Sequence, residues 1–317
     1  KNDKNKSYQS VYHLKENKLI QIETEEFPNS TISDEGNGDY ALISNRKPYQ
    51  LSSQWTGQFS ANDLAVLNIK TGVSKTVIKG LPSSARFSPK GKYAYGYNEI
   101  DSTWYTYNVK TDKYTELTKG KQFYNELNDY PNYPRSYGSA GWTNNDKTIL
   151  IYDRFDLWEF SPENGTQKKI TNGRKSKTTY RVIDLDSEKR FIDKTDKILM
   201  STFNEISKNS GYYEYNYKKN SGFQLVNGPY KYANIKKSRL NEKIIFTRQS
   251  FVDFPNLRIS DLSFNSQLMI TDANPQQKEY NWGTSELVNW TSLDGLPLTG
   301  MLIKPENFDP NKKYPMI

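Results

Sequence analysis

The stretch that decides the fold is residues 142–173, WTNNDKTILIYDRFDLWEFSPENGTQKKITNG. It opens with a polar turn, continues into an apolar strand at 148–152, and reaches a second strand at 157–160 in which apolar residues alternate. Asn164-Gly165 then indicates a tight hairpin, because both residues tolerate the positive φ of short β-turns. The stretch therefore predicts one unit of short antiparallel strands.

This unit recurs along the chain at intervals of roughly 35–55 residues, which is typical of a repeat architecture. Copies of the strand after the polar turn are found at 40–44 and 93–97. Copies of the second strand are found at 64–69, 104–109, 212–217 and 257–262, and copies of the end of the last strand at 117–120 and 270–272. Four short antiparallel strands per unit, repeated five times, predict the blades of an all-β propeller. Residues 11–22 are expected to form the outer hairpin of one further blade whose inner strands precede residue 1, so the ring is expected to be incomplete.

Composition limits the classes of protein that remain. The 317 residues include 24 Tyr and no Cys, and the formal net charge is +8. Aromatic residues at this frequency favour half-buried strands, and the lack of Cys excludes disulfides, thiol nucleophiles and zinc–thiolate sites. The Lys residues are scattered among acidic residues rather than clustered, so nucleic acid is not an expected partner. No stretch of about 18 apolar residues occurs, so no membrane span is expected.

The residues needed for catalysis are not assembled in this sequence. His13 is the single histidine, and a structural or solvent-facing role is expected for it. Ser139 lies in Tyr137-Gly138-Ser139-Ala140-Gly141, which fails the Gly-x-Ser-x-Gly pattern at its first position. Acidic pairs such as Asp153 and Asp156 carry no evidence for acid–base catalysis without geometry. We therefore expect no catalytic residue, no metal site and no cofactor within these residues.

Three stretches interrupt the repeat and are the candidates for binding groups, since loops on a rigid scaffold carry most of them. They are 46–62, 123–137 and the charged run 184–197. Ordinary variation in loop length is the alternative for each of the three.

The pattern changes after the last repeat. A strand at 286–291 is predicted to turn at Asp294-Gly295 and return at 298–304, because Asp-Gly between two apolar runs is a strong hairpin signal. An apolar run follows at 314–317. The segments 274–283 (NPQQKEYNWG), 290–295 (WTSLDG) and 304–308 (KPENF) resemble the prolyl oligopeptidase family. The segments 101–105 and 152–158 are similar to its bacterial, dipeptidyl-peptidase-IV-like branch.

This resemblance implies a domain organisation and a function. Residues 1–280 correspond to the propeller, and 281–317 to the junction hairpin and the first residues of an α/β-hydrolase domain. The parent protein is then a serine peptidase acting on short peptides, with its catalytic triad beyond residue 317. Its partners are peptide substrates and its own hydrolase domain. A periplasmic or secreted location is implied, while a cytoplasmic one, homo-oligomer formation and the total number of blades stay open.

The resemblance also suggests a substrate-binding position. The dipeptidyl branch holds the substrate's amino terminus with two adjacent Glu residues. The matching place is the stretch 123–137, where Glu126 and Asp129 are the acidic residues and no Glu-Glu pair occurs. We therefore expect a non-catalytic propeller that gates substrate access. The alternative is a propeller that only binds glycans or proteins and has no active hydrolase domain.

Overall fold

The computed structural model describes residues 5–56, 61–82 and 85–316. It divides into two compact units. The first comprises the described residues up to Ile183 together with Ser187–Met200 and Tyr215–Ser221, and the second comprises Asp184–Asp186, Ser201–Glu214 and Gly222–Ile317 as far as it is described. This division does not test the boundary at 280/281, which stays a prediction.

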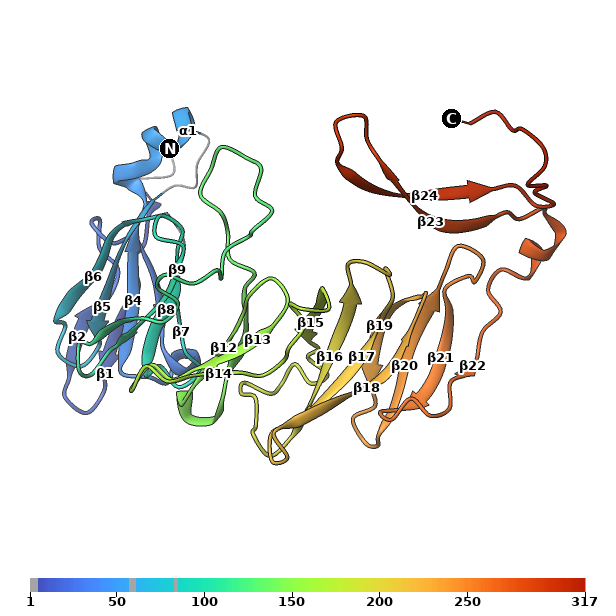
Figure 1. Ribbon diagram of the computed structural model, residues 1–317. Helices are drawn as coiled ribbons and strands as arrows, with labels where there is room; N and C mark the ends of the chain where they lie inside the picture. Colours follow the sequence, from blue (N-terminus) through green and yellow to red (C-terminus); the bar gives the residue numbers. More distant parts are fainter. Residues whose placement is uncertain (1–4, 57–60, 83–84, 317) are drawn as a thin grey trace. The chain divides into compact units, whose positions relative to one another are not determined.

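Antiparallel strands dominate the described chain, which contains five four-stranded sheets and two hairpins (Figure 1). The first hairpin is β1 (Ser10–His13) with β2 (Lys18–Gln21). The first four-stranded sheet consists of β3 (Asn29–Ile32), β4 (Tyr40–Asn45), β5 (Asn62–Asn68) and β6 (Ser74–Leu81). The second consists of β7 (Arg86–Phe87), β8 (Tyr93–Asn98), β9 (Thr103–Asn108) and β10 (Tyr114–Glu116).

The remaining sheets follow the same plan. The third consists of β11 (Ser139–Trp142), β12 (Ile149–Tyr152), β13 (Leu157–Phe160) and β14 (Gln167–Lys169). The fourth consists of β15 (Thr178–Val182), β16 (Lys197–Asn204), β17 (Ser210–Asn216) and β18 (Ser221–Gly228). The fifth consists of β19 (Lys231–Lys237), β20 (Lys243–Gln249), β21 (Asn256–Asp261) and β22 (Leu268–Met269). In every sheet the strands neighbour one another in chain order, as the repeat predicts.

A threonine closes three of the five sheets in the same way. The Oγ1 atoms of Thr118, Thr171 and Thr271 accept hydrogen bonds of 2.9, 3.0 and 2.9 Å from the main-chain N–H groups of Trp104, Leu157 and Leu257. The separation is 14 residues each time, so the hairpin between the third and fourth strands has a constant length. This hydrogen bond is the structural basis of the Leu-Thr and Ile-Thr pairs in the repeat.

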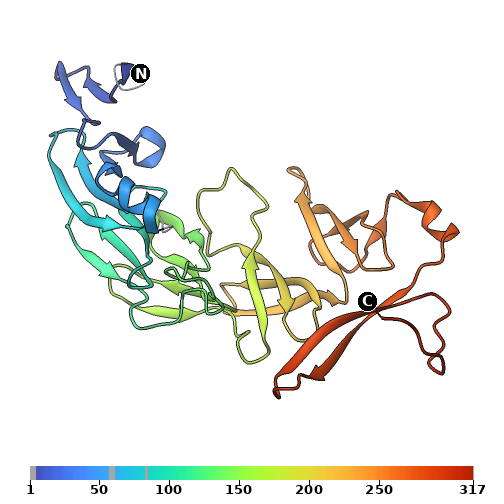
Figure 2. The same cartoon turned by 90° about the horizontal axis from the view of Figure 1, so that it is seen from above.

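Apolar side chains pack between successive sheets of the first unit. Figure 2 shows these sheets in chain order, coloured from blue to green. Ile22, Ile43 and Leu67 belong to a buried cluster shared by the β1–β2 hairpin and the first sheet. Leu42 and Val66 pack with Ala94 and Tyr107 between the first and second sheets. The largest cluster joins the second and third sheets and contains Tyr93, Tyr95, Tyr97, Trp104, Leu117, Phe123, Trp142, Ile149, Ile151 and Phe160. Aromatic strands thus supply the core that the composition predicted.

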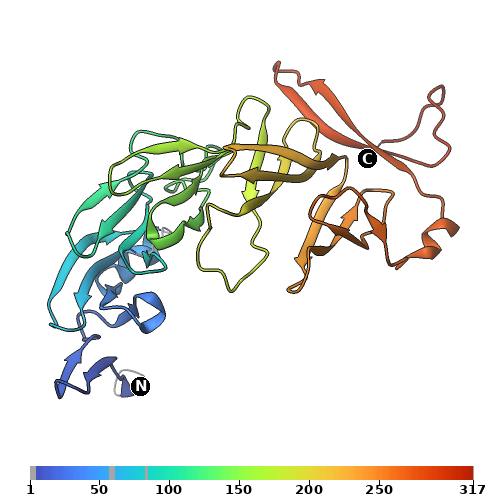
Figure 3. The same ribbon diagram turned by 90° about the horizontal axis from the view of Figure 1, so that it is seen from below.

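The second unit has an aromatic core of its own. The Tyr212 ring stacks on Phe264, with 4.8 Å between ring centroids, and lies edge-on to Tyr232 and Phe246. After this sheet comes the short 3₁₀ helix η5 (Pro275–Glu279), and then the hairpin of β23 (Thr284–Thr291) and β24 (Pro297–Lys304). Figure 3 shows this hairpin in red as a separate element. The predicted hairpin and its turn are confirmed, with Gly295 at φ 85°. Ile317, at the end of the predicted apolar run, lies outside the described residues.

The interrupting stretches differ in structure. Residues 46–62 contain a 3₁₀ helix, η3 (Lys47–Tyr49), and a short helix, α1 (Gln50–Thr56), which the sequence reasoning missed; residues 57–60 lie outside the described part. Two of the polar turns at the start of the repeats also form 3₁₀ helices, η2 (Asp34–Gly36) and η4 (Asn144–Asp146). The charged run 184–197 connects β15 to β16.

Candidate functional site

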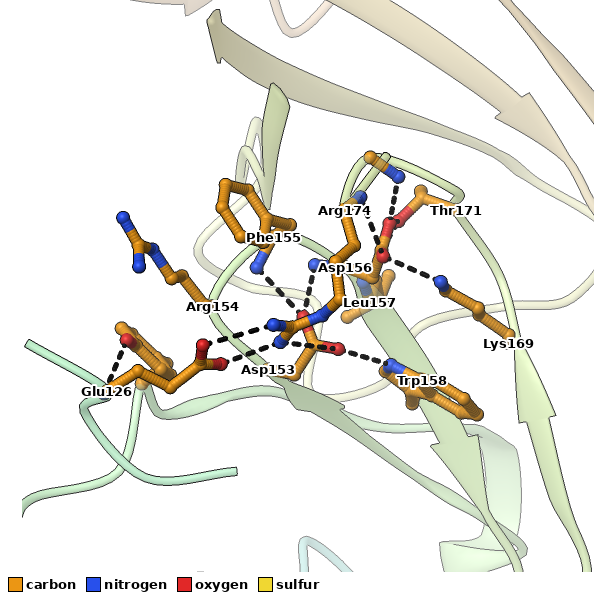
Figure 4. Close-up of polar contacts among 12 residues, drawn as sticks. Glu126, Asp153, Arg154, Phe155, Asp156, Leu157, Trp158, Lys169, Thr171 and Arg174 are labelled. Atoms are coloured by element: carbon orange, nitrogen blue, oxygen red, sulfur yellow. Dashed lines mark hydrogen bonds and ion pairs between the residues drawn. The ribbon is translucent and has the colours of Figure 1, made fainter. Parts of the chain in front are cut away.

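The candidate site lies in the first unit, where the connection between β12 and β13 meets two other segments. These are the connection that follows β14 and the insertion 123–137 between β10 and β11, a green loop in Figure 1. Figure 4 shows its charged side chains, with the Arg174 guanidinium group between the carboxylates of Glu126 and Asp153. The site is therefore built from segments that a rigid sheet holds.

Asp153 begins the β12–β13 connection, and its carboxylate is fixed by its own turn. Oδ1 accepts hydrogen bonds from the main-chain N–H groups of Phe155 (2.8 Å) and Asp156 (2.6 Å), and Oδ2 accepts one from the indole N–H of Trp158 (3.0 Å). The side chain is 7% exposed. A carboxylate held by three donors has one defined orientation.

Asp156 ends the same connection and is fully buried. Its Oδ1 accepts hydrogen bonds from the Thr171 hydroxyl (2.8 Å) and from the main-chain N–H of Gly173. Its Oδ2 pairs with Lys169 Nζ at 2.8 Å. Burial of a charge is tolerated when it is paired and hydrogen-bonded in this way. Asp156 thus fixes the chain that leaves β14.

Arg174 follows Gly173 and forms a two-pronged ion pair with Glu126. Its Nη1 donates to Glu126 Oε2 at 3.0 Å and its Nη2 to Oε1 at 2.6 Å. The Asp153 carboxylate lies 3.5 Å from Nη2, and the guanidinium carbon lies 5.2 Å from the centre of the buried Phe155 ring. The hydrogen bonds to Glu126 are the main cause that raises the pKa of Arg174 above its usual value, and the negative charge of Asp153 raises it further. Arginine is not deprotonated in proteins, so this side chain stays charged.

The insertion 123–137 is fixed at its base. Phe123 is buried against the rings of Trp158 and Phe160, and the main-chain N–H of Asn125 donates to the Arg135 carbonyl at 2.7 Å. The Glu126 main-chain N–H donates to the Tyr137 hydroxyl at 2.9 Å. Leu127, Tyr130 and Tyr133 at the tip are exposed. The insertion thus has a fixed base and a tip that exposes apolar and aromatic side chains.

The structure treats the two predicted substrate-binding acids differently. Glu126 is mostly buried and paired with Arg174, whereas Asp129 is exposed near the tip of the insertion and forms no ion pair with the described residues. Sequence reasoning missed Arg174 altogether. No spacing in the sequence signalled it, because 48 residues separate Arg174 from Glu126. The two aspartates hold this arginine and are not free acids.

The other residues considered for catalysis have simple structural surroundings. A ring nitrogen of His13, Nε2, lies 2.7 Å from the Ile69 carbonyl, so it donates a proton there. Ser139 begins β11 and pairs in register with Ile151. Within the described ranges, no three His, Asp or Glu residues are grouped so that they could hold a metal ion. None of the described helices has the length and apolar character that a membrane crossing requires.

Comparison with known proteins gives matches among solved structures only, since neither a family model nor a curated protein matches the sequence. A candidate dipeptidyl aminopeptidase IV from Bacteroides ovatus matches 98% of this chain with a TM-score of 0.58 and 13% identity. Dipeptidyl peptidase 4 from Porphyromonas gingivalis matches 96% with a TM-score of 0.58 and 12% identity. The chain has a β-propeller fold. The sequence resemblance to dipeptidyl-peptidase-IV-like proteins is thus confirmed at the level of the fold.

The propeller chain spans about half the length of these similar proteins. The aligned part is 53% of the Bacteroides ovatus chain and 49% of the Porphyromonas gingivalis chain. At 12–13% identity the similarity extends to the fold and not to individual side chains. The β12–β13 connection, the insertion and Arg174 therefore have to be interpreted from their own chemistry.

Proposed function

We propose that this chain is the non-catalytic, substrate-gating propeller portion of a prolyl-oligopeptidase-type serine peptidase that hydrolyses short peptides. The observation that carries the proposal is the match of 96–98% of this chain to about half of two dipeptidyl peptidase IV chains. The motifs at 274–283, 290–295 and 304–308 support it independently, because they resemble the junction between propeller and hydrolase domain in that family. In this proposal, residues 1–280 are the propeller, and residues 281–317 are the junction hairpin and the first residues of the hydrolase domain.

The division of labour follows from the residues that are present. A serine peptidase needs a base beside its nucleophile, and the single histidine here, His13, is bonded to a main-chain carbonyl. The propeller would contribute selection instead, by limiting the size of peptides that reach a separate catalytic centre and by offering binding groups from its loops. The insertion 123–137 is the candidate for the second task, because its base is fixed while its tip is exposed.

Within this proposal, Glu126 and Asp129 bind the ammonium group at the amino terminus of the peptide. A carboxylate offers about four lone-pair sites, and Arg174 occupies two of those on Glu126. The remaining sites could accept an ammonium group in a charge-assisted hydrogen bond. Asp129 supplies a second negative charge from the exposed part of the same insertion.

The decisive experiment assays the product of the whole gene beside residues 1–317 alone. We expect the whole protein to cleave an X-Pro p-nitroanilide and to lose this activity with a serine-directed inhibitor, and the 317-residue chain to cleave nothing. Turnover by the 317-residue chain that the inhibitor abolishes would contradict the proposal. An inactive whole protein that binds glycans or proteins would support the binding-only propeller instead.

The ammonium assignment has its own test in the whole protein. Glu126→Gln combined with Asp129→Asn should raise KM for the substrate with a free amino terminus by about ten- to a hundredfold, since one charge-assisted bond contributes about 1.5–3 kcal/mol. KM for the same substrate with an acetylated amino terminus should not change. Equal effects on both substrates would exclude an ammonium-binding role.

A further inference from the structure

We propose that Arg174 is a positioning residue that fixes the Glu126 carboxylate, and with it the insertion 123–137, for contact with the peptide substrate. This inference rests on the proposed function. Arg174 lies outside the insertion, in the connection that follows β14, and it need not contact the substrate.

The main chain of Arg174 is held by one aspartate. Its N–H donates to Asp156 Oδ2 at 3.3 Å, and the preceding N–H, of Gly173, donates to Asp156 Oδ1. Asp156 cannot move easily, because it is fully buried and also bonded to Thr171 and Lys169. The start of the arginine side chain therefore has a defined place relative to β13 and β14.

The guanidinium group is held by the other end of the same short connection. Asp153 lies 3.5 Å from Nη2, and the buried Phe155 ring lies 5.2 Å from the guanidinium carbon (Figure 4). A planar guanidinium on an aromatic ring and beside a fixed carboxylate keeps few of its rotamers. In this orientation Nη1 and Nη2 both donate to Glu126. Four consecutive residues, 153–156, thus determine the direction in which the arginine fork points.

The fork then orients Glu126. Both carboxylate oxygens are bonded, at 3.0 and 2.6 Å, so the carboxylate plane cannot rotate without breaking a bond. Glu126 also lies at the base of the insertion, where its main-chain N–H donates to Tyr137 and where Asn125 pairs with Arg135. A shift of the Glu126 side chain would loosen this base. Arg174 therefore positions both the acid and the loop that carries it.

The two parallel hydrogen bonds from Arg174 to Glu126 distinguish a positioning role from a role in which Arg174 only neutralises the charge of Glu126. A lysine would keep the positive charge but would offer a point charge instead of a planar fork. We therefore expect Arg174→Lys to conserve stability better than Arg174→Gln and still to misplace Glu126. A purely electrostatic role predicts full rescue by lysine.

The test compares these two variants in the whole protein, with Lys119→Gln as the control. Lys119 is exposed, precedes the insertion in the chain and pairs with Glu116 at 2.7 Å. We expect KM for an X-Pro p-nitroanilide with a free amino terminus to rise about tenfold in Arg174→Gln and about threefold in Arg174→Lys, with kcat changed less than twofold. The acetylated substrate and the control should show no change. Unchanged KM in an active Arg174→Gln enzyme would overturn the inference while leaving the proposed function intact.

Hydrogen exchange gives a second readout that does not depend on activity. The main-chain N–H groups of Asn125, Glu126 and Asn128 are all hydrogen-bonded within the insertion. Arg174→Gln should speed their exchange at least tenfold, and leave the exchange of β12 and β13 unchanged. Unchanged exchange at these three positions would refute the positioning role. Should the whole protein cleave no peptide, the proposed function falls, and this measurement still decides whether Arg174 fixes the insertion.

Discussion

The Asp146 carboxylate accepts a hydrogen bond of 2.5 Å from the Ser88 hydroxyl, 58 residues earlier in the chain. The same carboxylate accepts the main-chain N–H groups of Lys90 (3.0 and 3.1 Å) and Lys92 (3.1 Å). Asp146 lies in the polar turn of the third sheet, and its partners lie in the corresponding turn of the second. The polar turns that indicate each repeat in the sequence therefore also join neighbouring sheets.

Asp146→Ala should be among the most destabilising single substitutions in the first unit. Asp146 is fully buried, so its removal leaves a hydroxyl and two main-chain donors without an acceptor. We expect a loss of about 2–4 kcal/mol in the free energy of unfolding. Urea denaturation measures it, with Asp196→Ala as the control because Asp196 pairs with Lys189 on the exposed surface. Equal stability of the two variants would contradict the role assigned to Asp146.

Arg190 should make the stability of the protein depend on pH on the acid side. It lies 2.8 Å from Asp34, and its hydrogen bond is the main cause that lowers the pKa of Asp34 from its usual value. Because the pKa of Asp34 is lower in the folded than in the unfolded protein, its ionised form stabilises the fold above about pH 3.9, the pKa of Asp in an unfolded chain. This stabilisation is lost as the pH falls through the pKa of Asp34 in the folded protein. We expect Arg190→Gln to be more destabilising at pH 6 than at pH 2.5, as measured by urea unfolding at both pH values. A deficit that is the same at both pH values would show that the Asp34 pair is not its source.

The fold was predictable where local rules determine it. Asn164-Gly165 and Asp294-Gly295 select tight turns by their own backbone preferences, and alternation marks the strands on either side. The first strand of the first three sheets escaped notice because β7 has two residues and β3 and β11 have four each, too few to show a period. In the fourth sheet the long connection 183–196 replaces the polar turn, so β15 and β16 lacked their signal.

The site was less predictable from the sequence than the fold, because its residues come from separate segments. Glu126 could be singled out as an acid in an interrupting loop. Arg174 could not, because 48 residues separate it from Glu126 and only the packing of the third sheet brings them together. The roles of Asp153 and Asp156 depend in the same way on which donors surround them, which no spacing in the sequence reveals.

Threonine-to-valine substitutions test the repeated hydrogen bond that closes three of the sheets. Valine has nearly the shape of threonine but cannot accept the N–H of the partner strand. We expect Thr118→Val and Thr171→Val, at buried positions, to cost about 1–3 kcal/mol each, as measured by urea unfolding. Thr171→Val should cost the most, because its hydroxyl also donates to Asp156. Thr271→Val is the matched control at a half-buried position, where water can replace the lost acceptor, and a cost equal to that of Thr118→Val would argue against this explanation.

Tyr97 should make the stability depend on pH on the alkaline side. Burial raises the pKa of Tyr97 to about 12, and its hydroxyl donates to the Pro134 carbonyl at 3.1 Å, at the base of the insertion. In the unfolded chain the Tyr97 hydroxyl loses its proton near pH 10. The contribution of Tyr97 to the free energy of unfolding is therefore complete below pH 10 and is lost as the pH rises through about 12. Tyr97→Phe should therefore cost about 1 kcal/mol at pH 8 from the lost hydrogen bond, and a smaller amount at pH 11. Unfolding midpoints in urea at both pH values measure the difference, and the exposed Tyr133→Phe controls for loss of a hydroxyl group. A deficit that stays constant from pH 8 to pH 11 would show that Tyr97 does not remain protonated in the folded protein.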